Sequence, residues 1–356
     1  MAAQTYETHR HNPKLTGIGF PGTTNEGVVS RAGRVIIDES AVVPGTMEIE
    51  LPEGVRLRPF QWHRTSGGAF SFAFLEPGRV AVGAIEWNQP PVDDSSPVTL
   101  EELRATYARV LGRDLPIRVP EGDGPYGWTR LTVGNSRQAD RYREGRVLLL
   151  GDAAHVHPAV GGPGLNLGLQ DALNLGWKLA AEIQGWAPPG LLDTYQSERH
   201  PLGRRVLLHT QAQLALLAPG GDVSAVRQIF GELLDEEVVR RRIAELLAGA
   251  DVRYEMTGDP HPLLGKWMPD LPLRADGVKR VAELMRSVRP VLLDFTGNLD
   301  VTQWRDRVDH VRAETGDAPA GAILIRPDGY VAWAGERDGL EEALTTWFGH
   351  PSLVST

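Results

Sequence analysis

The segment from Gly145 to Lys178 constrains the fold of this chain more than any other part of the sequence. It opens with the apolar run Val147–Leu150, which lacks alternation and is typical of a strand covered on both faces. A Gly-Asp pair and a glycine-rich loop follow, and a helical apolar pattern then begins. That pattern comprises Leu165, Leu169, Ala172, Leu173, Gly176, Leu179, Ala180 and Ile183. The segment therefore predicts a strand, a turn, a loop and a long helix, in that order.

This arrangement can hold a polar, partly anionic ligand. Asp152 can accept hydrogen bonds from hydroxyl groups, Pro158 stiffens the loop, and the loop glycines reach backbone conformations closed to other residues. The backbone N–H groups at the start of the predicted helix are free, and the helix dipole favours negative charge there. The candidate cofactor-binding residues are Gly151, Asp152, Ala153, Pro158, Gly161, Gly162, Gly164, Leu165 and Asn166. The alternative is a glycine-rich turn that binds nothing.

The motif GRVLLLGDAAHVHPAVGGPGLNLGLQDALNLGWKLA resembles the second flavin-binding motif of the class A FAD-dependent aromatic hydroxylases, the para-hydroxybenzoate hydroxylase-like monooxygenases. The flanking sequences NSRQADRYREGRV and LLDTYQSERHPLGRRVLLHT follow the same family pattern, nearest to the branch that acts on polyketide and antibiotic substrates. The resemblance implies that Asp152 holds the ribityl chain of FAD, that Pro158 lies beside the isoalloxazine ring, and that Gly161–Asn166 stabilises the reduced ring. Pro163 departs from the glutamine of many members, but the polyketide branch tolerates proline there.

The resemblance implies an FAD-dependent monooxygenase that hydroxylates an aromatic or polyketide small molecule with NAD(P)H and O2. The cofactor carries that chemistry, while the protein supplies helix-end electrostatics and a dry pocket. No side-chain nucleophile or acid–base pair stands out, so we name no catalytic residue. His155 and His157 lie in a loop without a third ligand at metal spacing, which favours structural roles and no metal site.

The sequence predicts an α+β or α/β fold with three regions. Residues 1–135 form a mixed β-sheet substrate domain, residues 136–258 the C-terminal half of an FAD-binding domain, and residues 259–356 a C-terminal domain. Predicted strands of the first region are Gly27–Ile37, Thr46–Leu51, Ala69–Leu75 and Arg79–Trp87. A helix over Thr99–Leu111 interrupts them, with Thr99 as its N-cap and Glu102 completing a capping box. A second long helix is expected over Leu191–Leu217.

The last region has a β-α-β-β-α pattern that resembles a thioredoxin-like domain. Val291–Phe295 predicts a strand, Val301–Glu314 a helix, and Gly339–Phe348 a closing helix. Between the two helices, Ala322–Ile325 and Tyr330–Ala334 predict a hairpin. The chain has no cysteine and so no CxxC motif, and a structural or dimer-contact role is expected.

Composition excludes several classes of protein. A formal charge of −9 argues against a nucleic-acid surface. Zero cysteines exclude disulfides, thiolate catalysis and cysteine-type zinc sites. The N-terminal stretch lacks the apolar region of a signal peptide, and no apolar run is long enough to span a membrane. A cytoplasmic protein is expected.

Gly17-Ile-Gly-Phe-Pro-Gly22 spells the dinucleotide-binding G-x-G-x-x-G pattern. That pattern needs a preceding apolar strand and a helix opening inside it, whereas Pro21 forces Phe20 away from helical geometry. We therefore expect the start of the substrate domain here and no ADP-binding half. The ADP half of FAD has about 25 heavy atoms, worth ~7–8 kcal/mol at roughly 0.3 kcal/mol each.

Three explanations of the missing half stay open. One is a split enzyme completed by a separate Rossmann-bearing polypeptide. Another is a flavin-free remnant that acts as a substrate-binding accessory or a cyclase-like or isomerase-like protein. The third is a start codon placed too late in a longer reading frame. A homodimer is a further expectation.

Aromatic side chains of the first region are candidates for the substrate pocket. They are Trp62, Phe70, Phe72 and Trp87. Strand alternation makes an ordinary core the alternative for each. Arg31 and Arg64 are weaker candidates for substrate or nicotinamide contacts, and Glu198-Arg199-His200 predicts a surface ion pair with helix packing.

Overall fold

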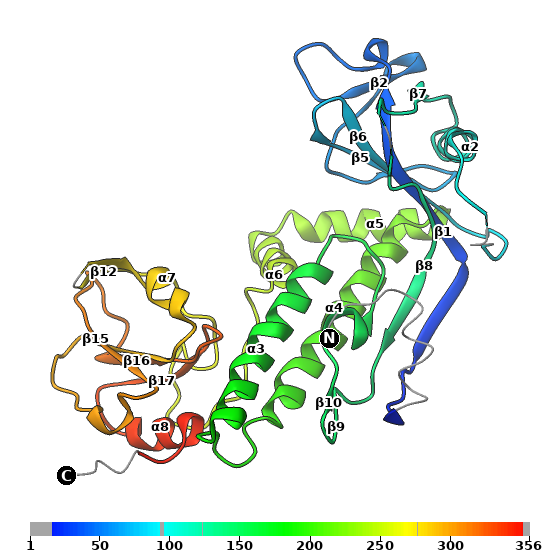
Figure 1. Ribbon diagram of the computed structural model, residues 1–356. Coiled ribbons are helices and arrows are strands. Elements are labelled where there is room, and N and C mark those ends of the chain that lie inside the picture. The colour runs from blue at the N-terminus through cyan, green and yellow to red at the C-terminus, as the bar shows by residue number, and fades with distance from the viewer. Residues whose placement is uncertain (1–15, 93–95, 123, 276, 352–356) are drawn as a thin grey trace.

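The computed structural model describes residues 16–92, 96–122, 124–275 and 277–351. Figure 1 shows three units in chain order: a β-sheet unit, a group of long central helices, and a C-terminal unit built on a small sheet. The predicted mixture of α and β structure is confirmed. The N-terminal stretch in which no signal peptide was expected lies outside the described residues.

The first unit is a seven-stranded sheet with antiparallel pairing throughout, in the order β11-β8-β1-β6-β5-β4, with β7 paired to the end of β1. Its strands are β1 (Gly22–Ile37), β4 (His63–Arg64), β5 (Ala69–Glu76), β6 (Arg79–Glu86), β7 (Ile117–Arg118), β8 (Thr129–Gln138) and β11 (His155–Val156). A hairpin of β2 (Ile49–Leu51) and β3 (Val55–Leu57) accompanies it. β8 crosses residue 135 and β11 comes from the glycine loop, so the sheet draws on the first two predicted regions. The domain limits themselves stay predictions.

The predicted capped helix of this unit is confirmed as α2 (Leu100–Leu111). The Thr99 side chain accepts a hydrogen bond from the Glu102 backbone N–H at 3.2 Å. α2 lies over one face of the sheet and buries Leu103, Tyr107 and Val110 against it. This core fixes the shape of the sheet.

The glycines of residues 17–22 allow two chain segments to pack closely, and no helix of the dinucleotide-binding kind begins among them. Residues 17–21 are irregular, and Gly22 begins strand β1. A Cβ on Gly19 would lie 2.5 Å from the Asp140 carboxylate, and one on Gly22 would lie 2.2 Å from the Ser136 carbonyl oxygen. The close approach of two chain segments therefore accounts for the G-x-G-x-x-G pattern.

Four helices form the central unit. They are α3 (Gly164–Gln184), α4 (Thr194–Leu217), α5 (Gly221–Leu234) and α6 (Glu237–Ala248). α3 and α4 pack side by side, α5 lies across the end of α4 toward the sheet unit, and α6 lies beside α5 (Figure 1). None of the helices that the structure describes has the length and apolarity needed to cross a membrane.

The expected helix α3 forms, but the buried face predicted for it is wrong. Leu165, Leu169 and Ile183 of the apolar pattern are 75%, 54% and 84% exposed. The buried side instead carries Leu167, Asp171, Asn174, Leu175, Trp177, Lys178 and Ala181. The helix is apolar on more than one side, and its charged residues are buried because they find partners. Helical spacing alone could not distinguish the two faces.

The strand predicted before the Gly-Asp pair is also different. Only β10 (Val147–Leu148) forms, as a short antiparallel hairpin with β9 (Arg143–Glu144). Val147 is 43% exposed, whereas Leu149 is buried. The prediction of a strand covered on both faces is therefore wrong for the described residues, where no second strand flanks β10.

The C-terminal unit is built on a four-stranded sheet with the order β15-β14-β16-β17. The resemblance to a thioredoxin-like domain stays a prediction. The main elements of this unit are β14 (Val291–Asp294), β15 (Asp309–Arg312), β16 (Ala322–Ile325), β17 (Val331–Gly335) and α8 (Leu340–Phe348). A hairpin of β12 (Pro272–Ala275) and β13 (Val278–Arg280) leads into α7 (Val281–Leu284). β14 pairs parallel with β15 and antiparallel with β16.

The helix predicted over Val301–Glu314 is wrong. A single 3-10 turn, Thr302–Trp304, forms instead, because Trp304 and Val308 pack into the core. The chain then extends as β15 beside β14. Backbone pairing with β14 outweighs the helical spacing of this segment.

A buried ionic cluster joins the central helices to the C-terminal unit. Arg326 follows β16, is fully buried, and donates to both Glu198 carboxylate oxygens of α4 at 2.5 and 2.8 Å. It also pairs with Asp328, and its guanidinium lies 4.5 Å from the centre of the Trp347 ring. Lys178 of α3 donates to Glu198 at 2.7 Å. Two cations thus face two carboxylates out of contact with water.

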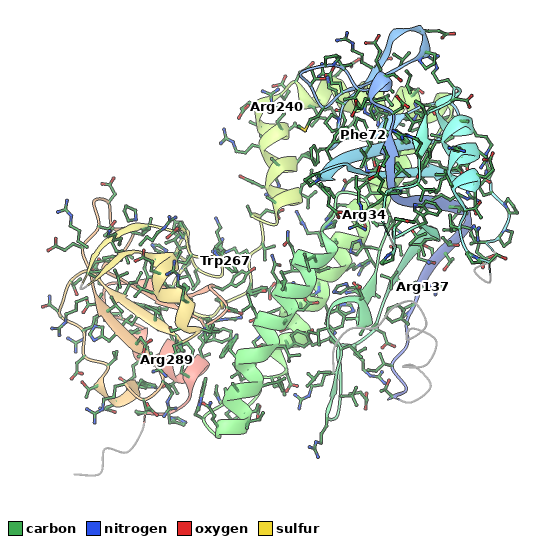
Figure 2. The ribbon with its side chains drawn as sticks, turned by 45° about the horizontal axis from the view of Figure 1, so that its top comes forward. Arg34, Phe72, Arg137, Arg240, Trp267 and Arg289 are labelled. Carbon is green, nitrogen blue, oxygen red and sulfur yellow. The ribbon has the colours of Figure 1, made fainter. Side chains whose placement is uncertain are left out.

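We expect Arg326→Met to lower the free energy of unfolding by about 3–5 kcal/mol, because it leaves buried carboxylates without their main partner. Urea denaturation measures the change. The control is Arg289→Met, which removes a half-exposed pair with Asp309 (Figure 2) and is expected to cost under about 1 kcal/mol. Equal effects of the two substitutions would contradict the stabilising role of the cluster.

Candidate cofactor site

The Gly-Asp pair lies in a tight turn against the start of α3. Gly151–Ala153 form a 3-10 turn in which Gly151 has φ +56°, a left-handed conformation that favours glycine. A Cβ on Gly168 of α3 would lie 3.5 Å from the Gly151 Cα, so the turn and the helix touch backbone to backbone. The Asp152 side chain is exposed, and no described residue donates a hydrogen bond to it. Its carboxylate is available to an external hydroxyl.

The glycine loop and the helix start present backbone donors. Gly161 and Gly162 both have positive φ, and a Cβ on Gly161 would lie 2.8 Å from Gln213 Oε1. Pro163 caps α3 without a side-chain hydrogen bond, and its carbonyl accepts from Leu167 N–H. The N–H groups of Gly164, Leu165 and Asn166 therefore precede the first helical hydrogen bond, as the sequence predicts.

The loop contacts the sheet unit through a small apolar cluster. Pro158 and Val160 are buried, and Val160 packs with Leu214 and Leu217 of α4. Trp62 and Trp87, both half-buried, pack against this same cluster. The structure thus places these two candidate pocket residues on the side of the sheet that faces the glycine loop.

Phe70 and Phe72 lie elsewhere. Both are buried in the core between the sheet and α2, where Phe70 stacks edge-on with Tyr107. Figure 2 shows Phe72 in the sheet unit. Strand alternation directs them to the face opposite Ala69, which belongs to the Val160 cluster. Phe70 and Phe72 therefore belong to an ordinary core, which is the alternative to a pocket role that the strand alternation offers.

The arginine candidates of the sheet unit are engaged in the fold. Arg31 pairs with Glu86 and Glu102. Arg64 donates to the carbonyl oxygens of Ala218 and Gly220 beyond the end of α4. Both guanidinium groups are thus held by protein partners.

A small hollow of about 70 Å³ opens beside the first turn of α3. Pro163 and Asn166 line it from α3, Arg205 and His209 from α4, and Leu247 from α6. No sequence motif indicates this hollow, because its walls come from three separate helices.

Three histidines, His155, His157 and His209, lie on or near the glycine loop. The described residues contain no cluster of side chains that could hold a metal. His155 is buried and pairs with Asp171 at 2.8 Å. His157 lies against Gly164, and burial lowers its pKa below the usual value. Burial also lowers the pKa of His209, and the nearby His157 adds to this effect.

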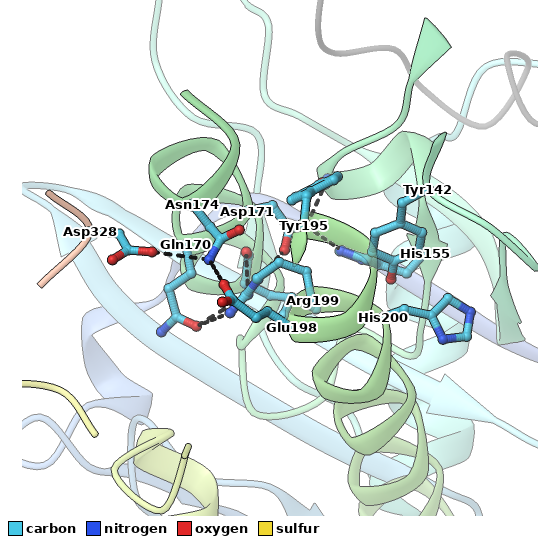
Figure 3. A network of polar contacts seen from close by, with 12 residues as sticks. Tyr142, His155, Gln170, Asp171, Asn174, Tyr195, Glu198, Arg199, His200 and Asp328 are labelled. Atoms are coloured by element: carbon cyan, nitrogen blue, oxygen red, sulfur yellow. Dashed lines mark hydrogen bonds and ion pairs between the residues drawn. The ribbon is translucent and has the colours of Figure 1, made fainter. Parts of the chain in front are cut away.

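Three buried residues behind the loop were missed or misjudged from the sequence. Asp171 contacts the Gly151 backbone N–H, His155 and Arg199 (Figure 3). The surface ion pair predicted around Glu198 and Arg199 is wrong, because Glu198 is 7% exposed and Arg199 is fully buried. The charged residues that interrupt the apolar residues of both α3 and α4 could have indicated buried ion pairs.

These residues fit the flavin implied by the sequence. A ribityl chain needs hydroxyl partners and an electron-rich ring needs backbone donors. The exposed Asp152 and the free N–H groups of Gly164–Asn166 supply them beside a loop whose glycines leave room for close approach.

Comparison with known proteins gives the class. An FAD binding domain model matches residues 62–210, and an aromatic-ring hydroxylase C-terminal model matches residues 261–351. The 12-dehydrotetracycline 5-monooxygenase/anhydrotetracycline 6-monooxygenase of Streptomyces rimosus subsp. rimosus is 40% identical over 96% of this chain and 68% of its own length. The chain belongs to the FAD-dependent aromatic-ring hydroxylases, a family of flavin monooxygenase enzymes.

Two further comparisons define its position in that family. The solved structure of the anhydrotetracycline hydroxylase from Streptomyces rimosus superposes with a TM-score of 0.79 at 38% identity, over 96% of this chain and 67% of that one. A dialkyldecalin synthase of Streptomyces rugosporus is 43% identical over 76% of this chain and 54% of its own length. The predicted resemblance and the FAD cofactor are thereby confirmed.

We expect the free energy of unfolding to fall as the pH drops below about 6.5, the ordinary histidine pKa. His157 and His209 have lowered pKa values in the folded chain. The unfolded chain therefore binds more protons in this window, and stability present above it is lost at a slope of at most ~1.4 kcal/mol per pH unit for each histidine. Urea denaturation from pH 7.5 to 5 measures this. The double variant H157Q/H209Q should flatten the profile, and an unchanged slope in that variant would contradict the assignment.

Proposed function

We propose that this chain forms part or all of an FAD-dependent monooxygenase that hydroxylates an aromatic or polyketide substrate with NAD(P)H and O2, acting in the cytoplasm. The observation that carries the proposal is the exposed Asp152 carboxylate beside the uncapped start of α3. The similarity to an anhydrotetracycline monooxygenase supports the substrate class.

The residues of the site would divide the work as follows. Asp152 would accept hydrogen bonds from the ribityl hydroxyls and so fix the cofactor. The N–H groups of Gly164–Asn166, at the positive end of α3, would stabilise negative charge on the ring. FAD, when bound and reduced by NAD(P)H, supplies the activation of O2.

The apolar cluster around Val160 would keep water from the reacting atoms. Val160, Leu214 and Leu217 are buried beside the half-buried Trp62 and Trp87. An aromatic substrate between these tryptophans and the glycine loop would meet apolar walls on the side of the sheet. Phe70 and Phe72 would support that wall from the opposite face.

The ADP half of the cofactor would be held by a unit that packs on the exposed side of α3. Leu165, Leu169 and Leu173 form an exposed apolar stripe that begins at the cofactor loop. An ADP-binding Rossmann unit would cover it. Size-exclusion chromatography with and without FAD shows whether the chain by itself also associates with a second copy.

A second candidate function rests on the similarity to the dialkyldecalin synthase. That protein's name describes the synthesis of a dialkyldecalin, and a decalin is a pair of fused carbon rings. The same pocket would then bind a polyketide and fold it for a cyclisation or isomerisation, either with flavin in a structural role or as a flavin-free accessory protein.

The visible spectrum of the purified protein tests the main proposal. We expect flavin absorption bands, present on purification or after addition of FAD. NAD(P)H and O2 should then be consumed when an aromatic polyketide is added. A protein that binds a polyketide but gains no flavin bands would favour the second function. A protein that binds neither would contradict both.

We expect Asp152→Ala to weaken FAD binding about ten- to hundredfold, because a hydrogen bond to a charged group is worth ~1.5–3 kcal/mol. Quenching of flavin fluorescence measures the dissociation constant. Glu182→Gln is the control, since Glu182 is an exposed carboxylate near the far end of α3. A similar loss in both variants would point to net charge and remove Asp152 from the site.

A further inference from the structure

One buried carboxylate contacts both ends of the segment that carries Asp152. Asp171 of α3 is fully buried, and its Oδ2 atom accepts from the Gly151 backbone N–H at 3.1 Å and from His155 Nε2 at 2.8 Å. These two donors lie at the two ends of residues 151–155. The carboxylate therefore contacts both ends of the turn that presents Asp152, and Figure 3 shows Asp171 beside His155 and Arg199.

The other oxygen of Asp171 is anchored to the neighbouring helix. Arg199 of α4 donates from Nε to Asp171 Oδ1 at 2.7 Å. The remaining guanidinium nitrogens of Arg199 donate to Tyr254 Oη at 3.0 Å and to the Leu167 carbonyl oxygen at 3.3 Å. Asp171 thus has no freedom to follow a moving loop.

Asp171 is ionised beside Arg199. Burial raises the pKa of Asp171, but the hydrogen bond from His155 and the charge of Arg199 outweigh it, so the pKa lies below the ordinary value. An ionised carboxylate can only accept, which makes Nε2 the protonated nitrogen of His155. His155 Nδ1 is buried without a hydrogen-bond partner, so the proton of His155 can move to Nδ1 and leave Nε2 as an acceptor. The Gly151 N–H can only donate and therefore always needs an acceptor.

We infer that Asp171 is a positioning residue of the cofactor site: it fixes the 151–155 turn, and hence the Asp152 carboxylate, relative to α3, and Arg199 holds it in place. This inference rests on the proposed function for its cofactor, but the contacts that carry it belong to the chain itself. Asp171 touches no cofactor and acts through Gly151 and His155.

Asp171→Asn tests the inference at nearly constant volume. An asparagine offers one acceptor oxygen and one amide, and only the His155 contact can adapt, by a change of tautomer. With the oxygen toward Arg199, the Gly151 N–H loses its acceptor. The double variant D171N/R199Q removes the uncompensated charge that would otherwise confuse a stability effect with a positioning effect.

The control is Lys178→Met. Lys178 lies two turns further along α3 and is equally buried, but it donates to Asn174 and Glu198 and not to the cofactor turn. Its loss should lower stability without disturbing residues 151–155.

The first measurement is amide hydrogen exchange on the whole chain without flavin. We expect exchange in a peptide covering residues 150–155 to rise about ten- to hundredfold in D171N and in D171N/R199Q, and to stay near the wild-type rate in K178M. Unchanged exchange in both Asp171 variants, or an equal rise in K178M, would overturn the inference.

The second measurement is FAD affinity, by fluorescence quenching. We expect a weaker dissociation constant in the Asp171 variants than in a K178M protein of equal melting temperature. Wild-type affinity in the Asp171 variants would also overturn the inference. Absence of FAD binding by the wild-type chain would contradict the proposed function alone, and hydrogen exchange would then decide the role of Asp171.

Discussion

The pairing of Glu198 with Arg326 and Lys178 is the interaction on which the arrangement of the central helices and the C-terminal unit depends. Burying four charges costs several kcal/mol per ion, which their mutual attraction offsets only when the geometry is good. Here Arg326 binds both oxygens of Glu198 and lies against aromatic rings. The next residue on α4, Arg199, pairs with Asp171, which in turn contacts the cofactor turn. One helix therefore holds the C-terminal unit on one side and the candidate site on the other.

Local sequence signals predicted the elements that depend on neighbours in the chain. The Thr99 cap, the strands around Pro77-Gly78 and the start of α3 are of this kind. Predictions failed where distant partners decide the outcome. Residues 309–312 extend because β14 offers a parallel neighbour, and α3 buries charged residues because α4 and the segment after β16 bring opposite charges.

The candidate site shows the same division. The Gly-Asp turn, the loop glycines and the helix start follow one another in sequence, so their motif could be recognised, although their contacts with a cofactor stay predictions. Asp171 and Arg199 come from separate helices, and no spacing rule links them to Gly151. Among the aromatic candidates, alternation correctly groups Phe70 with Phe72, but the choice between the two faces of the sheet depends on where α2 packs.

The glycine loop joins the large sheet through β11, where His155 and Val156 pair with Gln138 and Arg137 of β8. The strands that carry Phe70 and Ile85 belong to the same sheet. Backbone pairing, and not side-chain packing, therefore sets the distance between the glycine loop and these strands. We expect that Trp62 and Trp87, which are only partly buried against the Val160 cluster, tolerate exchange for residues of different size while the loop keeps its place. A scaffold of this kind can change what it accepts during evolution without rebuilding the part that performs the chemistry.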